Sequence, residues 1–196
     1  MSQTPLRLAV VGAGAMGRTH VDQIRASDEC TLAAICDPDP VRARSASSGE
    51  CPSYSELAEL LSHEHIDGAI ISTPNDQHGT CGVRCAKSGV HLLVEKPIAA
   101  THADGRALVE AADRHGVQLL VGQHRRHSTY VQHAREALQR GDIGRLINFT
   151  ALWFIRKPDD YYVGWHTRPG GVVALARGAR RGIEMAVPLA QQPPDA

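Results

Sequence analysis

The sequence predicts an α/β fold, in which a doubly wound parallel sheet is followed by the start of a second α/β domain with an open sheet. Two observations predict the first sheet. Short apolar segments alternate with helical segments as far as residue 122, and strands that are apolar throughout are typical of parallel sheets covered on both faces. A third observation predicts the second sheet, because a long β-rich segment occupies 145–154.

Each predicted element follows from its local pattern. Strands are expected over the apolar segments 6–11, 31–36, 67–73, 90–94 and 117–121. Helices are expected over 15–27, 40–47, 56–61, 76–88, 101–115 and 129–140. Pro40 suits a first helical turn. Ser55 and Thr101 suit the N-cap position, and Gly116 suits the end of the helix that Thr101 begins.

These elements divide the chain into three regions. Residues 1–123 form the complete doubly wound domain, and 124–175 form part of a substrate and dimerisation domain. Residues 176–196 carry no clear period and are rich in Arg, Gly and Pro, so we expect a divergent, disordered tail.

A glycine motif follows the first strand and opens the first helix. It reads Gly12-x-Gly14-x-x-Gly17. Gly12 permits the tight turn, Gly14 lets a pyrophosphate approach the backbone, and Gly17 allows close packing of helix and strand. The pyrophosphate would face the N–H groups at the helix N-terminus. The motif in this context predicts a Rossmann-type dinucleotide site.

An acidic residue stands where such a site needs one. Asp37 lies 20 residues after Gly17, at the end of the second predicted strand. Its carboxylate can accept hydrogen bonds from the adenosine ribose and would repel a 2′-phosphate, so NAD is favoured over NADP. The alternative is an acid in a solvated turn before a proline.

Composition excludes several function classes. Lys plus Arg and Asp plus Glu each number 21, and only 4% of residues are aromatic, so nucleic acid is not an expected partner. No apolar run has the length of a membrane span, and the N-terminus does not have the pattern of a signal peptide. Five cysteines without a disulfide spacing indicate reduced thiols and a cytoplasmic protein.

Polar motifs follow the next two predicted strands. Thr73-Pro74-Asn75 comes after one, with His78 close behind, and Glu95-Lys96-Pro97 comes after the other. Both would lie at the carboxyl edge of the sheet, where open α/β sheets bind ligands. A lysine there can hydrogen-bond a substrate oxygen and stabilise an alkoxide. Lys96 is therefore the candidate catalytic residue, and the alternative is a solvated lysine in a turn.

Together these motifs resemble the Gfo/Idh/MocA family of glucose–fructose oxidoreductases and inositol dehydrogenases. The resemblance covers about residues 5–171 and extends through Gly122-Gln-His-Arg-Arg126 to Trp153, Lys157-Pro158, Trp165 and Gly170-Gly171. It implies an NAD-dependent oxidoreductase that acts on the hydroxyl or carbonyl group of a sugar, inositol or related polyol. It also implies a C-terminal α/β domain with an open sheet, and a homo-oligomer if that second sheet forms.

The resemblance also implies roles for individual residues. Lys96 is the catalytic lysine, with a cis bond to Pro97. The implied cofactor-binding residues are Gly12, Ala13, Gly14, Ala15, Met16, Asp37, Thr73, Pro74, Asn75, His78, Glu95, Lys96 and Pro97. The implied substrate-binding residues are Arg125, Trp153, Trp165 and His166. No metal is expected, since His78, Cys81 and Cys85 on one helix cannot surround a tetrahedral ion.

The sequence departs from the family pattern near its end. The family's helix with an Asp or Asn followed by a His is absent, and no histidine follows His166. One explanation is a truncation or frame shift after about Leu175, which the abrupt gain in Arg, Gly and Pro favours. The other is a genuine short form, a catalytically inactive NAD-binding module that acts as a sensor or subunit partner.

Overall fold

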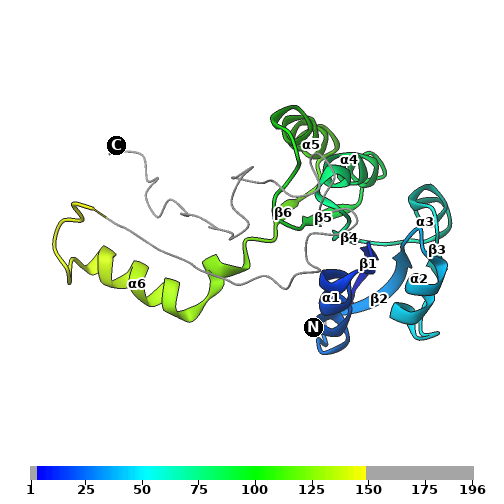
Figure 1. The fold of residues 1–196 in the computed structure, drawn as a ribbon, viewed down its shortest axis with the longest axis horizontal. Helices are drawn as coiled ribbons and strands as arrows, with labels where there is room; N and C mark the ends of the chain where they lie inside the picture. Colours follow the sequence, from blue (N-terminus) through cyan, green and yellow to red (C-terminus); the bar gives the residue numbers. More distant parts are fainter. Residues whose placement is uncertain (1–3, 149–196) are drawn as a thin grey trace, which may run out of the picture. The chain divides into compact units, whose positions relative to one another are not determined.

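The computed structural model describes residues 4–148 of the chain (Figure 1). These residues fall into two compact units. The first ends at Gln123 and the second begins at His124.

The first unit contains a six-stranded sheet in which every pair of neighbours is parallel. Its strands lie in the order β3-β2-β1-β4-β5-β6. Their bounds are β1 Leu6–Val11, β2 Cys30–Cys36, β3 Ser53–Tyr54, β4 Gly68–Ile71, β5 His91–Val94 and β6 Leu119–Val121. This order is that of a Rossmann-type sheet, which confirms the predicted fold class for this part of the chain.

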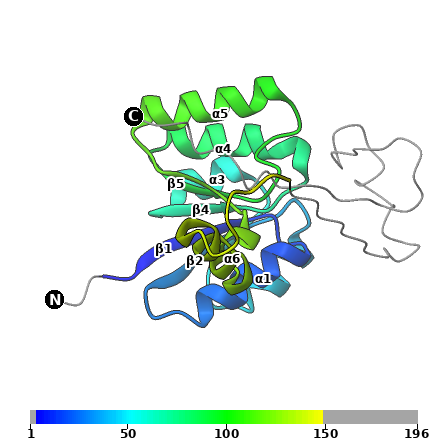
Figure 2. The same cartoon turned by 90° about the vertical axis from the view of Figure 1, so that its left-hand side faces the viewer.

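Helices cover both faces of the sheet (Figures 1 and 2). The helices α1 Ala15–Arg25 and α2 Pro40–Ser47 pack on one face. The helices α3 Leu57–His63, α4 His78–Lys87 and α5 His102–His115 pack on the other. Successive strand residues point to opposite faces, so Val10 joins the first core and its neighbours Ala9 and Val11 join the second. Apolar strands are needed because neither face meets water.

Most of the predicted helix ends are confirmed. Asp39 caps α2 by accepting hydrogen bonds from two backbone N–H groups, and Pro40 follows as the first helical residue. Thr101 caps α5, and Gly116 ends it in the left-handed conformation. The predicted N-cap at Ser55 is wrong, because α3 begins at Leu57 after Glu56, whose side chain makes no capping hydrogen bond.

The register of the sheet aligns the ends of the central strands. Val11 at the end of β1 pairs with Cys36 on one side and Ile71 on the other, and Ile71 pairs with Val94. The residues that follow these strands therefore lie side by side along the carboxyl edge. The chain reverses direction across the sheet between β1 and β4, and this switch point is where such folds bind ligands.

In the second unit, η2 His124–His127 precedes the helix α6 Thr129–Arg140. Ser128 caps α6, and Gly141 ends it with a φ of +78°. The predicted helix over 129–140 is thus confirmed.

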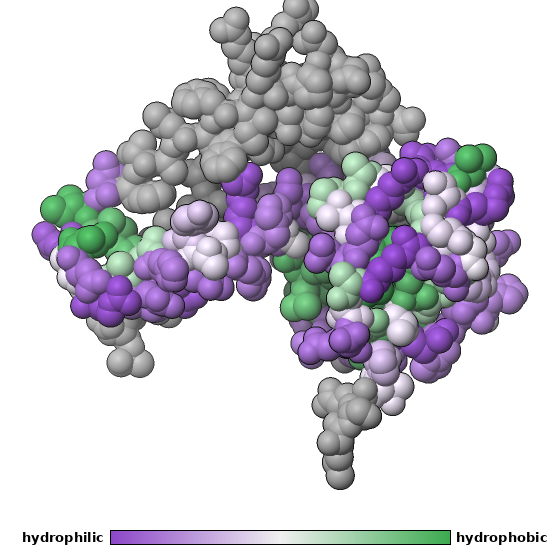
Figure 3. Space-filling view, turned by 90° about the horizontal axis from the view of Figure 1, so that it is seen from below, coloured by the Kyte–Doolittle hydropathy of each residue, from purple (hydrophilic) through white to green (hydrophobic). Residues whose placement is uncertain are grey.

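The strand predicted over 145–154 is wrong for its described part, since residues 145–148 are not in a strand. A strand needs a partner for its backbone groups, and no described residue supplies one there. The remainder of that segment lies outside the described residues, as do the rest of the predicted second domain and the tail. Figure 3 shows one face of the molecule coloured by hydropathy, on which both hydrophilic and hydrophobic residues reach the surface. Ile143 and Ile147 are among the exposed apolar residues. Among residues 4–148, no helix has the length and apolar character needed to cross a bilayer.

Candidate functional site

The turn after β1 has the geometry that its glycines predict. Gly12 has a φ of +94°, and a Cβ atom on it would lie 2.7 Å from the backbone of Ser72. A Cβ atom on Gly17 would collide with the carbonyl oxygen of Gly12. Gly14 differs, because nothing lies within 4 Å of the place its Cβ atom would take. Gly12 and Gly17 are thus needed for packing, while Gly14 leaves the turn open to a ligand.

The start of α1 offers an anion site. Gly14 is the N-cap and no side chain caps the helix. Ala15 and Met16, which begin the helix, are exposed. First-turn N–H groups have no partner within a helix, and the helix dipole adds partial positive charge there. The residues present therefore fit the pyrophosphate of a dinucleotide.

Asp37 is buried at the end of β2, only 5% exposed, so the alternative of a solvated turn acid does not hold. Its Oδ2 accepts a hydrogen bond of 2.8 Å from the N–H of Ala13, which ties the tip of β2 to the glycine turn. Its Oδ1 accepts from the N–H of Asp39 at 2.9 Å and lies 3.2 Å from Nε of Arg42. A carboxylate offers about four acceptor positions, so these contacts leave room for a ribose hydroxyl.

The segment after β4 lies against the glycine turn. The hydroxyl of Ser72 donates a 2.7 Å hydrogen bond to the carbonyl oxygen of Gly12. Thr73, Pro74 and Asn75 follow and are half-buried, and Asn75 begins the short helix η1 Asn75–Gln77.

The hydroxyl of Thr73 is buried and has no nitrogen or oxygen partner among the described residues. It interacts with the thiol of Cys81 instead. Burial raises the pKa of Cys81, and the Thr73 hydroxyl partly offsets this effect. The hydroxyl therefore points into the protein and is not presented to a ligand at the sheet edge.

His78 is the first residue of α4 and is almost fully buried. Its Nδ1 lies 2.7 Å from the carbonyl oxygen of Pro97, and its Nε2 lies 2.9 Å from the carbonyl oxygen of Thr73. In either neutral tautomer one of these contacts is a hydrogen bond, and in the doubly protonated ring both are. Since protein carbonyl groups occupy both nitrogens, the ring has no polar group left for the cofactor.

Glu95 follows β5 and is buried. Its Oε1 accepts a hydrogen bond of 2.9 Å from Nε2 of His20 on α1, and its Oε2 accepts one of 3.2 Å from the N–H of Lys96. The hydrogen bond from His20 lowers the pKa of Glu95, against the opposing effect of burial. A Cβ atom on Gly122 would stand 3.1 Å from this carboxylate, so the glycine makes room for it.

Lys96 extends from this turn toward solvent. Its side chain is exposed, and its positive charge contributes to the lowered pKa of Glu95. The bond between Lys96 and Pro97 is cis, as the resemblance implies. The turn thus presents an ammonium group at the same sheet edge as the glycine turn and Asp37.

Sequence reasoning assigned no role in this site to three of its residues: His20, Ser72 and Gly122. His20 stands three residues after Gly17 on α1, a spacing that places both on one side of the helix. Because Gly17 faces the sheet, this spacing was a usable signal for His20. Ser72 opens the motif that continues with Thr73 and could have been included on that ground. The need for Gly122 depends on where the Glu95 side chain lies, which no local pattern reveals.

None of the substrate-binding residues expected from the resemblance lies in the described part of the first unit. Arg125 lies in η2 of the second unit, where it is exposed and interacts with neighbouring groups. Trp153, Trp165 and His166 lie outside the described residues.

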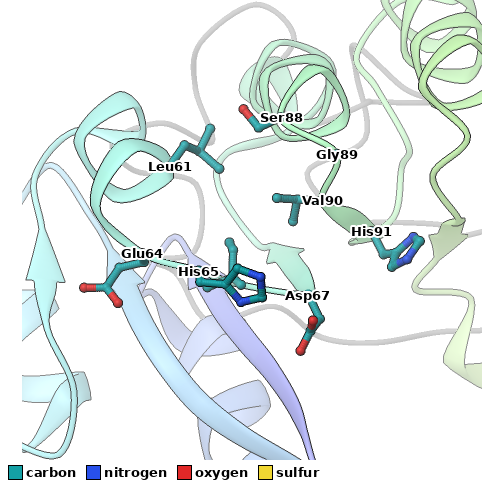
Figure 4. Close-up of a pocket in the computed structure, with 9 residues that line it drawn as sticks. Leu61, Glu64, His65, Asp67, Ser88, Gly89, Val90 and His91 are labelled. Atoms are coloured by element: carbon teal, nitrogen blue, oxygen red, sulfur yellow. The ribbon is translucent and has the colours of Figure 1, made fainter.

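A hollow of about 280 Å³ lies at the opposite, amino edge of the sheet (Figure 4). Its lining includes His65, Asp67 and His91, next to the starts of β4 and β5. Asp67 accepts a hydrogen bond from the N–H of Arg7, and His91 accepts one from the N–H of Gln118. Within the described part of the chain, no three His, Cys, Asp or Glu residues could hold a metal ion. The side chains of Asp67 and His91 thus bind backbone groups of neighbouring segments.

Comparison with known proteins agrees with the geometry of the carboxyl edge. Residues 6–123, more than half of the chain, match the GFO_IDH_MocA model, which describes an oxidoreductase family with an NAD-binding Rossmann fold. D-apiose dehydrogenase of Paraburkholderia graminis is 36% identical over 138 residues, which are 69% of this chain and 37% of that protein. Myo-inositol 2-dehydrogenase of Thermotoga maritima is 28% identical over 142 residues, 71% of this chain and 42% of that protein.

A solved structure is similar as well. The WlbA dehydrogenase from Bordetella pertussis, crystallised with NADH and UDP-GlcNAcA, superposes with a TM-score of 0.71 at 28% identity. The match covers 74% of this chain and 42% of that one. The chain thus spans less than half the length of these relatives. The glycine turn and the geometry of the carboxyl edge agree with the match over residues 6–123. The chain therefore belongs to the GFO_IDH_MocA oxidoreductase family and contains its NAD-binding Rossmann domain.

Proposed function

We propose that this chain belongs to an NAD-dependent oxidoreductase that acts on a sugar, an inositol or a related polyol. The reaction interconverts a hydroxyl and a carbonyl group of that substrate. The observation that carries the proposal is the position of Lys96: an exposed ammonium group, beside a buried carboxylate, at the sheet edge that also holds the glycine turn and Asp37.

The cofactor half of the site would hold NAD through residues of three strand ends. The open turn at Gly14 and the uncapped start of α1 suit the pyrophosphate. Asp37 would hold the adenosine ribose. The segment of Thr73, Pro74 and Asn75 would line the cofactor path, and Glu95 would lie on the nicotinamide side. When bound, NAD supplies the group that takes up or gives back the hydride.

Lys96 would act on the substrate oxygen. Its ammonium group donates a hydrogen bond to that oxygen and stabilises the negative charge that develops there. At neutral pH the Glu95 carboxyl is ionised even at its ordinary pKa of 4.5, and the hydrogen bond from His20 lowers that pKa further. The ammonium group of Lys96 carries three N–H donors and no acceptor, so it can supply the hydrogen bond to the substrate oxygen.

The named relatives support this substrate class. They include a dehydrogenase for D-apiose and one for myo-inositol, and the WlbA structure holds a sugar nucleotide beside NADH. A small-molecule sugar or polyol is therefore the proposed substrate. The proposed assembly is a homo-oligomer.

The test is reduction of NAD, followed by absorbance, with a panel of inositols, aldoses and sugar acids. We expect turnover with at least one member and its loss in Lys96→Ala, by a factor of about 10² to 10⁴ if the lysine is the proton donor. Lys87→Ala is the matched control, since Lys87 is an exposed lysine at the end of α4.

The alternative function, an NAD-binding module without catalysis, predicts a different result. It rests on the cofactor half of the site, since the open turn at Gly14 and the buried Asp37 can hold NAD whether or not a substrate reacts. A protein that binds NADH in a fluorescence titration, yet turns over no member of the panel, would establish this alternative and exclude the enzyme.

A further inference from the structure

The turn that carries Lys96 is held on two sides by histidines from different helices. His20 belongs to α1, on one face of the sheet, and His78 begins α4, on the other. Among the described residues, the hydrogen bonds of these two histidines go to Glu95, Pro97 and Thr73 and not to the Lys96 side chain. Both contact the groups on either side of it.

His20 acts through Glu95. The ring donates through Nε2 to Oε1 of the carboxylate at 2.9 Å, and Oε2 accepts the backbone N–H of Lys96 at 3.2 Å. The carboxylate therefore bridges the ring of His20 and the main chain of Lys96. Gly122 stands next to this carboxylate, because a Cβ atom added to it would lie 3.1 Å from the Glu95 side chain.

His78 acts on the next peptide group. Its Nδ1 lies 2.7 Å from the carbonyl oxygen of Pro97, and its Nε2 reaches the carbonyl oxygen of Thr73 on the neighbouring segment. The ring itself is held tightly. The residue is only 1% exposed, and its helix packs closely on α5, where a Cβ atom on the adjacent Gly79 would come within 2.9 Å of Asp104.

We propose that His20 and His78 are positioning residues, which brace the Glu95–Pro97 turn from both faces of the sheet and thereby fix the direction in which Lys96 leaves the backbone. This inference rests on the proposed role of Lys96. It assigns no contact with substrate or cofactor to either histidine, and it replaces the expectation that His78 lines the cofactor path.

The two histidines use different nitrogens toward the turn, and this difference makes the proposal testable. The amide nitrogen of Gln takes roughly the place of His Nε2, while that of Asn takes roughly the place of Nδ1. His20→Gln therefore keeps a donor for Glu95, and His20→Asn loses it. At the other site the order is reversed: His78→Asn keeps the donor for Pro97, and His78→Gln keeps only the contact with Thr73.

The readout is the amine of Lys96 itself. The chain has three lysines, at 87, 96 and 157, so reductive methylation with ¹³C-formaldehyde gives a simple NMR spectrum that Lys96→Arg assigns. We expect the Lys96 signal of His20→Gln and His78→Asn to stay near the wild-type position. We expect His20→Asn and His78→Gln to move it by more than a line width. His91→Gln, at the amino edge of the sheet, is the control and should leave the signal in place.

Gln should preserve the Lys96 signal at position 20, whereas Asn should preserve it at position 78. A general loss of stability would not produce this reversal between the two sites. Both variants of a pair giving the same Lys96 signal, or both unfolding by circular dichroism, would overturn the proposal for that histidine. If the wild type turns over a polyol, His20→Asn and His78→Gln should also lower kcat by roughly ten- to a hundredfold, with KM for NAD nearly unchanged. Absence of turnover in the wild type would refute the proposed function, while the NMR result would stand independently.

Discussion

At the scale of single residues, Gly14 and Gly17 stand three positions apart but face different surroundings. The Cβ position of Gly17 is occupied by the backbone of Gly12, whereas that of Gly14 is open. We expect Gly17→Ala to lower the free energy of unfolding by about 1–3 kcal/mol, the usual cost of overpacking. Gly14→Ala should change stability by less than about 1 kcal/mol, since its φ of −70° suits alanine.

For NADH binding we expect Gly14→Ala to have the larger effect of these two variants. The added methyl group of Gly14→Ala stands where the pyrophosphate must approach, so NADH affinity should fall by about tenfold or more, equivalent to about 1.4 kcal/mol. Urea unfolding and fluorescence titration measure the two effects on the same samples. If Gly14→Ala bound NADH as well as the wild type does, the pyrophosphate would not lie on this turn.

Asp37 carries the prediction for cofactor choice. Asp37→Ala should weaken NAD binding by roughly tenfold or more, because a hydrogen bond to a charged group contributes about 1.5–3 kcal/mol. NADP binding should weaken less, since the carboxylate repels the 2′-phosphate. Asp37→Asn is the control: its side-chain oxygen can still accept the N–H of Ala13, while the charge and the acceptor for the N–H of Asp39 are lost. Equal weakening of both cofactors in a titration would remove Asp37 from the ribose site.

Glu95 makes stability depend on pH. Its pKa in the folded protein is lowered from the ordinary value of 4.5, chiefly by the hydrogen bond from His20. A group whose pKa is lower in the folded state stabilises the fold above the unfolded pKa, and that contribution is lost as pH falls through the folded pKa. We expect the free energy of unfolding to decrease below about pH 4.5, and to decrease less steeply in Glu95→Gln.

The control variant for this prediction changes an acidic residue that accepts no hydrogen bond from a histidine among the described residues. Asp113→Asn is suitable, since Asp113 lies exposed on α5. Parallel stability curves for the wild type and Glu95→Gln between pH 3 and 5 would show that the contact with His20 does not hold the carboxylate in its charged form.

At the scale of elements, the strands β1, β2, β4, β5 and β6 were predictable because each belongs to an apolar segment long enough to be recognised. The two-residue strand β3 was not, since Ser53 and Tyr54 have no apolar pattern and owe their conformation to pairing with the end of β2. The carboxyl-edge arrangement followed from the parallel order alone. The sequence alone therefore predicts that Asp37, Thr73 and Glu95 lie on one edge of the sheet.

What side chains do at that edge could not be predicted in the same way. The contact between His20 and Glu95 depends on how α1 is rotated against the sheet, and residues 75 positions apart share no local pattern. His78 illustrates the same limit, because a polar residue after a strand suggests a ligand contact. Its ring instead turns inward to two carbonyl groups, which only the packing of α4 determines.

At the scale of the whole molecule, exposed apolar side chains in the second unit predict association between copies. Ile143, Leu146 and Ile147 are 64%, 43% and 88% exposed, and the segment that carries them follows α6. Large apolar groups gathered on a surface mark an interface or cause aggregation. We expect sedimentation velocity to show a species larger than a monomer, whose fraction rises with protein concentration.

Substitution locates the interface. The double variant Ile143→Lys and Ile147→Lys adds two charges to this segment, and burying them would cost several kcal/mol, so it should sediment as a monomer at concentrations where the wild type associates. Val41→Lys is the matched control, because Val41 is 67% exposed on α2 in the first unit. A wild type that remains monomeric at high concentration, or association that survives in the double variant, would show that these side chains do not drive assembly.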